Sequence, residues 1–276
     1  MKILETIAET RAACQRSPRP LGLVPTMGFL HDGHMALVNQ CRSDNEYAVA
    51  SVFVNPAQFS PQEDFSTYPR DMDADLAKLE AAGVDLVFTP SVDEIYPEGF
   101  AAFVDVGPLG ERLEGEFRPG HFRGVATVVC KLLSIVRPDR AYFGQKDAQQ
   151  CMVVEALSRD LNLGAEIVVV PTVRDPDGLA LSSRNAYLGE KERTAALLLS
   201  ASLNLAREIW LSGGTDTGLV KERMRALIEG NPLARIDYVS IADGDTLEEL
   251  DQLRRSALVS LAVNIGKTRL IDNVIL

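Results

Sequence analysis

The sequence has no long apolar run: none of its hydrophobic stretches approaches the roughly 20 residues that a membrane-spanning helix needs. Its four cysteines lie far apart and show no metal-binding spacing, which is typical of reduced core thiols in a cytoplasm. Basic residues are fewer than acidic ones: 28 Lys and Arg against 39 Asp and Glu give a net charge of -11. Nucleic acids and anionic membranes need basic faces, so we expect neither as a partner. The amino end has acidic residues in place of a signal peptide's apolar core, so we expect a cytoplasmic location.

Histidine is scarce too, and two of the three in the chain stand together in the stretch Pro25–His34. The stretch follows an apolar run, Leu21–Val24, that predicts a buried parallel strand, and it precedes a predicted helix from about Gly33 to Ser43. A strand, a glycine turn and a helix start together present N–H groups and a dipole to an anion. His31 and His34 are three residues apart and so share one face of the helix start. A histidine pair satisfied within a loop is the alternative, but the His-x-Gly-His pattern is similar to the ATP signature of the nucleotidylyl-transferase superfamily.

Apolar strands alternate with helical patterns in the first two thirds of the chain, which predicts an α/β fold with a parallel sheet. We expect strands over residues 47–54, 84–88, 103–106, 140–143 and 165–170. We expect helices over residues 2–16, 70–82 and 125–136, and from Asp147 onward. The predicted domain is Rossmann-like and covers residues 1–178. Residues 179–276, with two helical patterns and then strands, predict a smaller α+β domain that closes over the active site.

Two amide side chains follow the strand predicted over residues 47–54, in the sequence Asn55-Pro56-Ala57-Gln58. Open α/β sheets bind ligands at the C-terminal ends of their strands. We therefore expect Asn55 and Gln58 to lie at the same end of the sheet as the histidines. An amide both donates and accepts, which suits recognition of a hydroxyl together with a carboxylate. A plain Asn-Pro turn is the alternative interpretation.

A second charged turn follows the strand predicted over residues 140–143. Lys146 offers a point charge for a phosphate, and Gln150 lies one turn into the next helix on the same side. Asp147 either caps that helix or helps to hold a hydrated magnesium ion, and the cap is the better supported role.

Two long polar stretches interrupt the regular pattern. Residues 107–124 carry three arginines and a histidine, which suits a lid, a subunit contact or a plain solvated loop. Residues 171–185 contain Ser182, Ser183 and Arg184, whose hydroxyls and guanidinium fork match a phosphate. Such a loop can close over ATP, and an interdomain linker is the alternative.

Seven motifs, taken in order, resemble the pantoate–β-alanine ligase (pantothenate synthetase) family almost end to end. They are Pro25–His34, Phe53–Phe59, Tyr68–Arg70, His121–Gly124, Phe143–Gln150, Pro171–Asn185 and Thr268–Asn273. Several separate motifs in the same order are far more specific than any one of them. Two departures are small: Gln145 stands where the family usually has glutamate, and residues 64–67, Asp-Phe-Ser-Thr, differ from the commoner Asp-Leu-Asp-Ala.

The resemblance implies an enzyme that condenses pantoate with β-alanine through a pantoyl adenylate, using ATP and Mg²⁺ and releasing AMP and pyrophosphate. It implies small-molecule substrates, no metal site of the protein's own and a homodimer, for which residues 103–106 and the polar stretch behind them offer a contact surface. His34, His31 and Lys146 would be catalytic. Gln58 and Gln150 would bind pantoate, with Gln58 also binding β-alanine. The ATP-binding residues would be Met27, Gly28, Phe29, Leu30, His31, Asp32, Gly33, His34, Gly144, Gln145, Lys146, Asp147, Val173, Leu181, Ser182, Ser183 and Arg184.

Two other functions stay open at this point. A different nucleotidylyl transferase would join AMP or CMP to a phosphate acceptor and would lack the paired glutamines. A non-catalytic regulator would bind ATP through the same turn and never release pyrophosphate.

Overall fold

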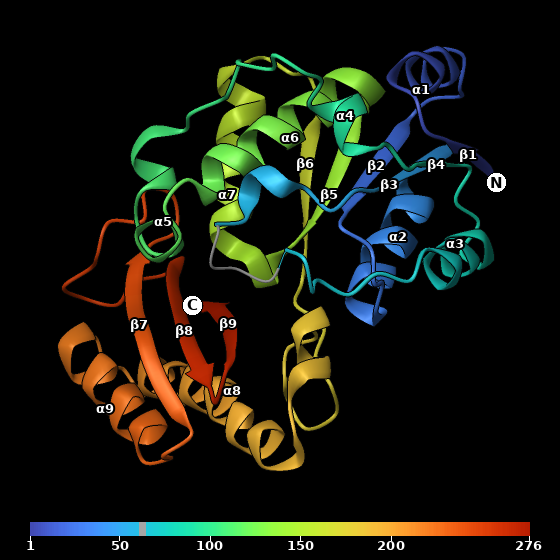
Figure 1. Ribbon diagram of the computed structural model, residues 1–276. Helices are drawn as coiled ribbons and strands as arrows, with labels where there is room; N and C mark the ends of the chain where they lie inside the picture. Colours follow the sequence, from blue (N-terminus) through green and yellow to red (C-terminus); the bar gives the residue numbers. More distant parts are fainter. Residues whose placement is uncertain (61–64) are drawn as a thin grey trace. The chain divides into compact units, whose positions relative to one another are not determined.

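The computed structural model describes residues 1–60 and 65–276 and divides the chain into two compact units (Figure 1). The first unit comprises Met1–Gln145 and Gln149–Pro171. The second comprises Thr172–Leu276 together with the short segment Lys146–Ala148.

A six-stranded parallel sheet in the order β1-β4-β3-β2-β5-β6 forms the centre of the first unit. Its strands are β1 (Lys2–Leu4), β2 (Leu21–Thr26), β3 (Tyr47–Val52), β4 (Leu86–Phe88), β5 (Arg140–Gly144) and β6 (Glu166–Val170). The chain adds β3 on one side of β2 and later adds β5 on the other side, so the strand order reverses at β2. Ligands of open α/β sheets bind at such a reversal, beyond the carboxyl ends of the strands.

Helices cover both faces of this sheet. The helices of this unit are α1 (Ile7–Cys14), α2 (Asp32–Asp44), α3 (Met72–Ala81), α4 (Val92–Ile95), α5 (Glu114–Phe117), α6 (His121–Val136) and α7 (Ala148–Asp160). Side chains alternate between the faces of a strand, so Leu21 and Leu23 join a core with α6 and α7, while Val24 joins another with α2 and α3. This three-layer arrangement explains why the strands read as continuous apolar runs.

The second unit packs two helices on a three-stranded antiparallel sheet in the order β7-β8-β9. Its elements are the 3₁₀ turn η4 (Ser183–Tyr187), α8 (Glu190–Leu211), α9 (Thr217–Glu229), β7 (Ala234–Asp243), β8 (Ala257–Ile265) and β9 (Thr268–Ile275). The predicted fold class, a Rossmann-like parallel sheet followed by a smaller α+β part, is therefore confirmed. Across the described residues, no helix combines the length and apolarity that crossing a membrane requires.

Three predicted elements differ from the structure. The helix predicted over residues 2–16 is instead β1 followed by α1, because Lys2–Leu4 pair with β4 and Thr6 caps the helix by accepting from the Glu9 N–H. Residues 103–106 form no strand: the Val104 N–H donates to the Thr127 side chain of α6, so this segment lies along a helix and not in a sheet. Helix α6 begins at His121, within the stretch predicted as a loop, because Gly120 adopts φ +82° and ends the loop there.

Candidate active site

The turn after β2 has an uncommon backbone conformation. Gly28 has φ +82° and Phe29 has φ 51°, so two successive residues lie in the left-handed region. Glycine adopts this region at little cost, whereas Phe29 is held there against its preference. A Cβ on Gly28 would also lie 2.9 Å from Asp75 Oδ2 and 3.1 Å from a Val52 methyl group. The surrounding contacts must therefore maintain the shape of this turn.

His31 and His34 cap the first turn of α2 reciprocally. His31 Nδ1 accepts from the Gly33 N–H at 3.1 Å, and His34 Nδ1 accepts from the His31 N–H at 3.3 Å. The two half-buried rings have centroids 4.1 Å apart. Because each Nδ1 is an acceptor, the hydrogen of each neutral ring is on Nε2. The spacing in the sequence predicted one shared face for both histidines, and the caps also determine which ring nitrogen donates.

Two side chains of helix α3, Asp75 and Lys78, bind the turn after β2, which is called the histidine turn below because it leads into His31 and His34. Asp75 is 2% exposed, and its two carboxylate oxygens accept from the consecutive N–H groups of Phe29 and Leu30, each at 2.7 Å. The Lys78 ammonium donates to the Leu30 carbonyl oxygen. Neither residue was predicted from the sequence. A signal was present, because Asp75 lies four residues before the fully buried Leu79 and so belongs to the core-facing side of the helix.

Several backbone N–H groups of the turn thus have partners inside the protein. Those of Phe29 and Leu30 point to Asp75, and those of His31 and Gly33 point to the histidine rings. An anion at this helix start would accordingly interact with the Nε2–H groups and the helix dipole more than with the amides of Phe29 and Leu30.

Asn55 and Gln58 lie beyond the carboxyl end of β3 and are both buried. Asn55 Nδ2 donates to Gln58 Oε1 at 2.9 Å, and Asn55 Oδ1 accepts from the Tyr96 hydroxyl at 2.7 Å. Burial raises the pKa of Tyr96 to about 12, so its phenol stays protonated and remains a donor. Gln58 Nε2 lies 3.3 Å from the Met27 sulfur in the histidine turn. The structure therefore brings Gln58 to the histidine turn, and Asn55 orients it.

The amino end of α6 fixes the backbone of Gln58. His121 Nδ1 donates to the Gln58 carbonyl oxygen at 2.9 Å, while Arg118 donates to His121 Nε2 at 3.1 Å. A Cβ on Gly124 would lie 2.1 Å from the Ala57 carbonyl oxygen, so only glycine allows this close approach. A pocket of about 240 Å³ opens here. It is lined by Ala57, Gln58, Phe59, Ser60, Phe103, Pro119, Gly120, His121, Arg123 and Gly124.

Two adjacent glutamines at the start of α7 differ in burial. Gln150, the predicted pantoate ligand, is half-buried. Gln149 is buried, donates to the carbonyl oxygens of Leu109 and Arg112 and accepts from the Glu114 N–H. Much of the polar stretch predicted over residues 107–124 is therefore anchored to α7, which the sequence pattern could not indicate.

Hydrogen bonds within the chain segment 172–184 hold the predicted ATP-binding residues of the second unit. Residues 172–181 fold back on themselves: Arg174 bridges to Ala180, and the Leu181 N–H donates to the Val173 carbonyl oxygen at 3.0 Å. Ser182 then caps the turn η4 by accepting from the Arg184 N–H at 3.2 Å. Val173 and Leu181 are thus brought side by side, with the Ser182–Arg184 turn next to them in the chain. In the same unit, the Asn273 side chain donates to the Lys146 carbonyl oxygen at 2.9 Å.

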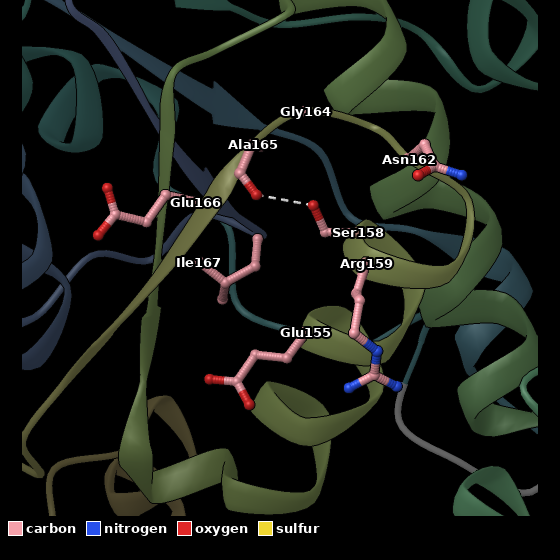
Figure 2. Close-up of a pocket in the computed structure, with 8 residues that line it drawn as sticks. All are labelled: Glu155, Ser158, Arg159, Asn162, Gly164, Ala165, Glu166 and Ile167. Carbon is pink, nitrogen blue, oxygen red and sulfur yellow. Dashed lines mark hydrogen bonds between the residues drawn. The ribbon is translucent and has the colours of Figure 1, made fainter.

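A second pocket, of about 570 Å³, lies at the amino end of β6 (Figure 2). Its lining comes from α7, the connection that follows it and the start of β6: Glu155, Ser158, Arg159, Asn162, Gly164, Ala165, Glu166 and Ile167. Ser158 Oγ donates to the Ala165 carbonyl oxygen at 2.7 Å, which joins α7 to the residue before β6. None of the predicted site residues lines this pocket, so size alone does not identify the functional site. Over residues 1–60 and 65–276, no three His, Cys, Asp or Glu side chains gather as a metal site would require.

Comparison with known proteins assigns the chain to a family. The family model described as pantoate-beta-alanine ligase matches residues 2–275. A pantothenate synthetase from Roseiflexus castenholzii is 56% identical over 276 residues, covering 100% of this chain and 99% of the relative. A pantothenate synthetase from Acetivibrio thermocellus is 51% identical over 278 residues, with 100% and 99% coverage.

Solved structures agree in fold. The crystal structure of pantothenate synthetase from Thermus thermophilus has a TM-score of 0.95 and 48% identity, covering 99% of both chains. The ligase from Francisella tularensis, described as a complex with beta-gamma ATP and beta-alanine, has a TM-score of 0.82 and 34% identity, with 100% and 97% coverage. On the whole-chain family match and these identities, the chain belongs to the pantoate–β-alanine ligase (pantothenate synthetase) family.

Proposed function

We propose that this chain catalyses the ATP-dependent condensation of pantoate with β-alanine to pantothenate, releasing AMP and pyrophosphate. The pantoate carboxylate attacks the α-phosphorus of ATP, and the bond to pyrophosphate breaks. The β-alanine amine then attacks the acyl carbon of the pantoyl adenylate, loses a proton and displaces AMP. The family membership supports the reaction. The observation that carries the assignment of the site is the pair of histidine caps, with both Nε2–H groups at the carboxyl end of β2.

The first step needs stabilisation of charge more than covalent chemistry by the protein. Negative charge builds on the phosphoryl oxygens as pyrophosphate leaves, and donors that are already in place lower that barrier without reorganising. His34 and His31 serve as those donors, and the α2 dipole adds to their effect. The contacts of Asp75 and Lys78 with the turn keep these donors in place.

Lys146 supplies positive charge to the polyphosphate, and the turn Gly144–Asp147 to which it belongs contributes further ATP contacts. Residues Val173, Leu181, Ser182, Ser183 and Arg184 complete the proposed ATP contacts. Mg²⁺ keeps most of its water and takes only one or two carboxylates beside substrate phosphates. The exposed carboxylate of Asp147 fits that donor set, and the ion would neutralise charge on the leaving pyrophosphate.

Gln58 and Gln150 bind pantoate in this proposal, and Gln58 also faces β-alanine. The contact of Asn55 with Gln58 Oε1 holds one end of that amide, which favours a single orientation of its donor end. A fixed amide positions the pantoate carboxylate for attack, and correct orientation accounts for a large part of catalysis in two-substrate reactions.

We also propose a homodimer, since closed two-fold dimers are the commonest soluble assembly. Phe103 is 40% exposed and stacks against the Arg123 guanidinium at 4.2 Å, so this face offers apolar area with a charged rim. Light scattering at micromolar concentration should give about twice the chain mass of 30.1 kDa, and a value near one chain mass would contradict the dimer.

The experiment that tests the reaction is isotope exchange between labelled pyrophosphate and ATP. Exchange should require pantoate and should not require β-alanine, because the adenylate forms first. Addition of β-alanine should then give pantothenate and AMP. Exchange that depends on β-alanine, or ATP binding without any pyrophosphate release, would contradict the proposed order of steps.

A further inference from the structure

The motif Thr268–Asn273 near the end of the chain has no role in the reaction as described so far. It forms most of β9, one of the two edge strands of the small sheet, and pairs with β8 through Asp272 opposite Leu261 and Asn273 opposite Ser260. Leu270 and Asp272 are two apart and share one face of the strand, the face that Leu270 presents to the apolar core. A carboxylate in that position needs a specific partner.

Arg174 is that partner. Its Nη1 lies 2.6 Å from Asp272 Oδ2 and its Nη2 lies 2.8 Å from Asp272 Oδ1, a two-pronged ion pair. Asp272 is 2% exposed, so the carboxylate would be a buried uncompensated charge without the guanidinium. Arg174 also donates to the Gly178 carbonyl oxygen at 3.1 Å. Asp272 is therefore joined to both sides of the folded-back segment 172–181, which carries Val173 and Leu181.

Asn273 reaches a different segment. Its Nδ2 donates to the Lys146 carbonyl oxygen at 2.9 Å, and its own N–H donates to Asp272 Oδ1 at 2.8 Å. The segment Lys146–Ala148 groups with the second unit, and this hydrogen bond joins it to β9 there. Two neighbouring residues of one strand thus have different partners. Asn273 binds the backbone of Lys146, and Asp272 binds Arg174 of the folded-back segment 172–181.

We infer that Asp272 and Asn273 are positioning residues for ATP: Asn273 sets the backbone from which the Lys146 ammonium reaches the polyphosphate, and Asp272 sets the Val173–Leu181 segment through Arg174. The inference rests on the proposed function. Neither residue touches the substrate in this account. Each acts by restricting a backbone that carries an ATP-binding group, which contributes to catalysis because small displacements of a reacting group are costly.

The same sheet offers matched controls. Asp237 also binds an arginine, accepting from Arg269 Nε at 2.8 Å, and Asn264 Nδ2 donates to Asp237 Oδ1 at 2.7 Å. Neither Asp237 nor Asn264 is among the residues proposed to bind substrate. The variants Asp237→Asn and Asn264→Ala therefore report what an ion pair and an amide hydrogen bond of this sheet contribute to stability alone.

The experiment measures the two half-reactions separately. Pyrophosphate exchange reports adenylation, and release of pantothenate from supplied pantoyl adenylate and β-alanine reports the second step. We expect Asn273→Ala and Asp272→Asn to lower kcat/KM for ATP in exchange by about 10-fold, within the range of a misplaced group, while the second step stays within about 2-fold. The control variants should leave both steps within about 2-fold. An equal loss in both steps would show that Asn273 and Asp272 only maintain folded protein and would overturn the inference.

A double-mutant cycle tests the connection to Lys146 directly. Lys146→Ala should lower exchange by about 100-fold, the usual scale for loss of a charge-stabilising group. Adding Asn273→Ala to it should then change exchange by no more than about 2-fold, because the group that Asn273 positions is gone. Independent, multiplied effects would refute a positioning role.

Failure of the proposed function gives a different pattern from failure of this inference. If the wild-type protein supports no exchange, the proposed function fails, and ATP binding then tests the inference on its own. Calorimetric titration with ATP should show that Asn273→Ala weakens binding in the wild-type background and not in the Lys146→Ala background. Equal weakening in both backgrounds would overturn the inference.

Discussion

Replacement of Asp75 should both destabilise the protein and slow adenylation. The carboxylate makes two hydrogen bonds of 2.7 Å to consecutive N–H groups, and it is almost completely buried. A hydrogen bond to a charged group contributes about 1.5–3 kcal/mol. Asp75→Ala should therefore lower the free energy of unfolding by about 3–6 kcal/mol, a large share of the roughly 5–15 kcal/mol typical of a folded protein.

The variant Asp75→Asn removes only one of the two hydrogen bonds that Asp75 accepts. The asparagine oxygen still accepts one N–H, but its NH₂ group faces the other, so one hydrogen bond is lost and one backbone donor is left unsatisfied. We expect a loss of about 2–3 kcal/mol, which lowers the melting temperature by about 4–12 °C for a domain of this size. Phe29 then loses part of what holds its positive φ, and the histidine turn should relax.

The assays are thermal unfolding by circular dichroism and pantoate-dependent pyrophosphate exchange. At a temperature where the variant is fully folded, exchange by Asp75→Asn should be at least about 10-fold slower than wild type, since the caps of His31 and His34 begin in the same turn. Asp73→Asn is the control, because Asp73 is an exposed carboxylate in the same first turn of α3. Its effect should stay within the roughly 0.3–1 kcal/mol of a helix-dipole contribution. A melting temperature within about 1 °C of wild type for Asp75→Asn, with normal exchange, would refute this account of the turn.

Three further predictions use simpler measurements. His34→Ala should fold normally and lower turnover by about 100-fold or more, and near-normal turnover at saturating substrates would exclude His34 as a donor. Gln150→Ala should weaken the binding of pantoate and leave the binding of ATP nearly unchanged in calorimetry. The reverse pattern would mean that the glutamine faces the nucleotide. The pKa of Asp243 is lowered to about 2 by the N–H groups of Asp245 and Thr246 and by Arg254. Its stabilising contribution should be complete above about pH 4 and be lost as the pH falls toward about 2, with the sign set by a folded-state pKa below the unfolded one. A carboxyl NMR titration of Asp243 with a midpoint near the ordinary aspartate value of about 4 would contradict this.

Sequence patterns predicted the elements whose formation depends on residues close together in the chain. The apolar run, glycine turn and histidine pair are neighbours in the chain, so β2 and the start of α2 could be predicted, and the structure agrees. The chain order of strands and helices likewise predicted the parallel sheet. Residues 103–106 show the limit: an apolar alternation becomes a strand only when a neighbouring strand accepts its hydrogen bonds, and here α6 accepts one instead.

The parts that could not be predicted depend on contacts between distant residues. Asp75 binds N–H groups 46 and 45 residues away, and Arg174 meets Asp272 across 98 residues. The adjacent glutamines Gln149 and Gln150 are chemically identical, and only the packing of α5 and η2 (Gly107–Gly110) beside α7 explains why Gln149 is structural. No periodicity in one sequence distinguishes them.

Asp75 and Asp272 nevertheless share a feature that a sequence can display. Each stands on the core-facing side of its element, one with Leu79 on a helix and the other with Leu270 on a strand. An acidic side chain in such a position is costly unless a donor reaches it. The neighbouring Asn273 N–H donates to Asp272, but the arginine that compensates its charge and both N–H donors to Asp75 are distant in the chain. In this protein the partners are the histidine turn and the arginine of the Val173–Leu181 segment, two backbone segments proposed to bind ATP. A core-facing carboxylate is therefore a reason to expect a distant segment of the chain that it anchors.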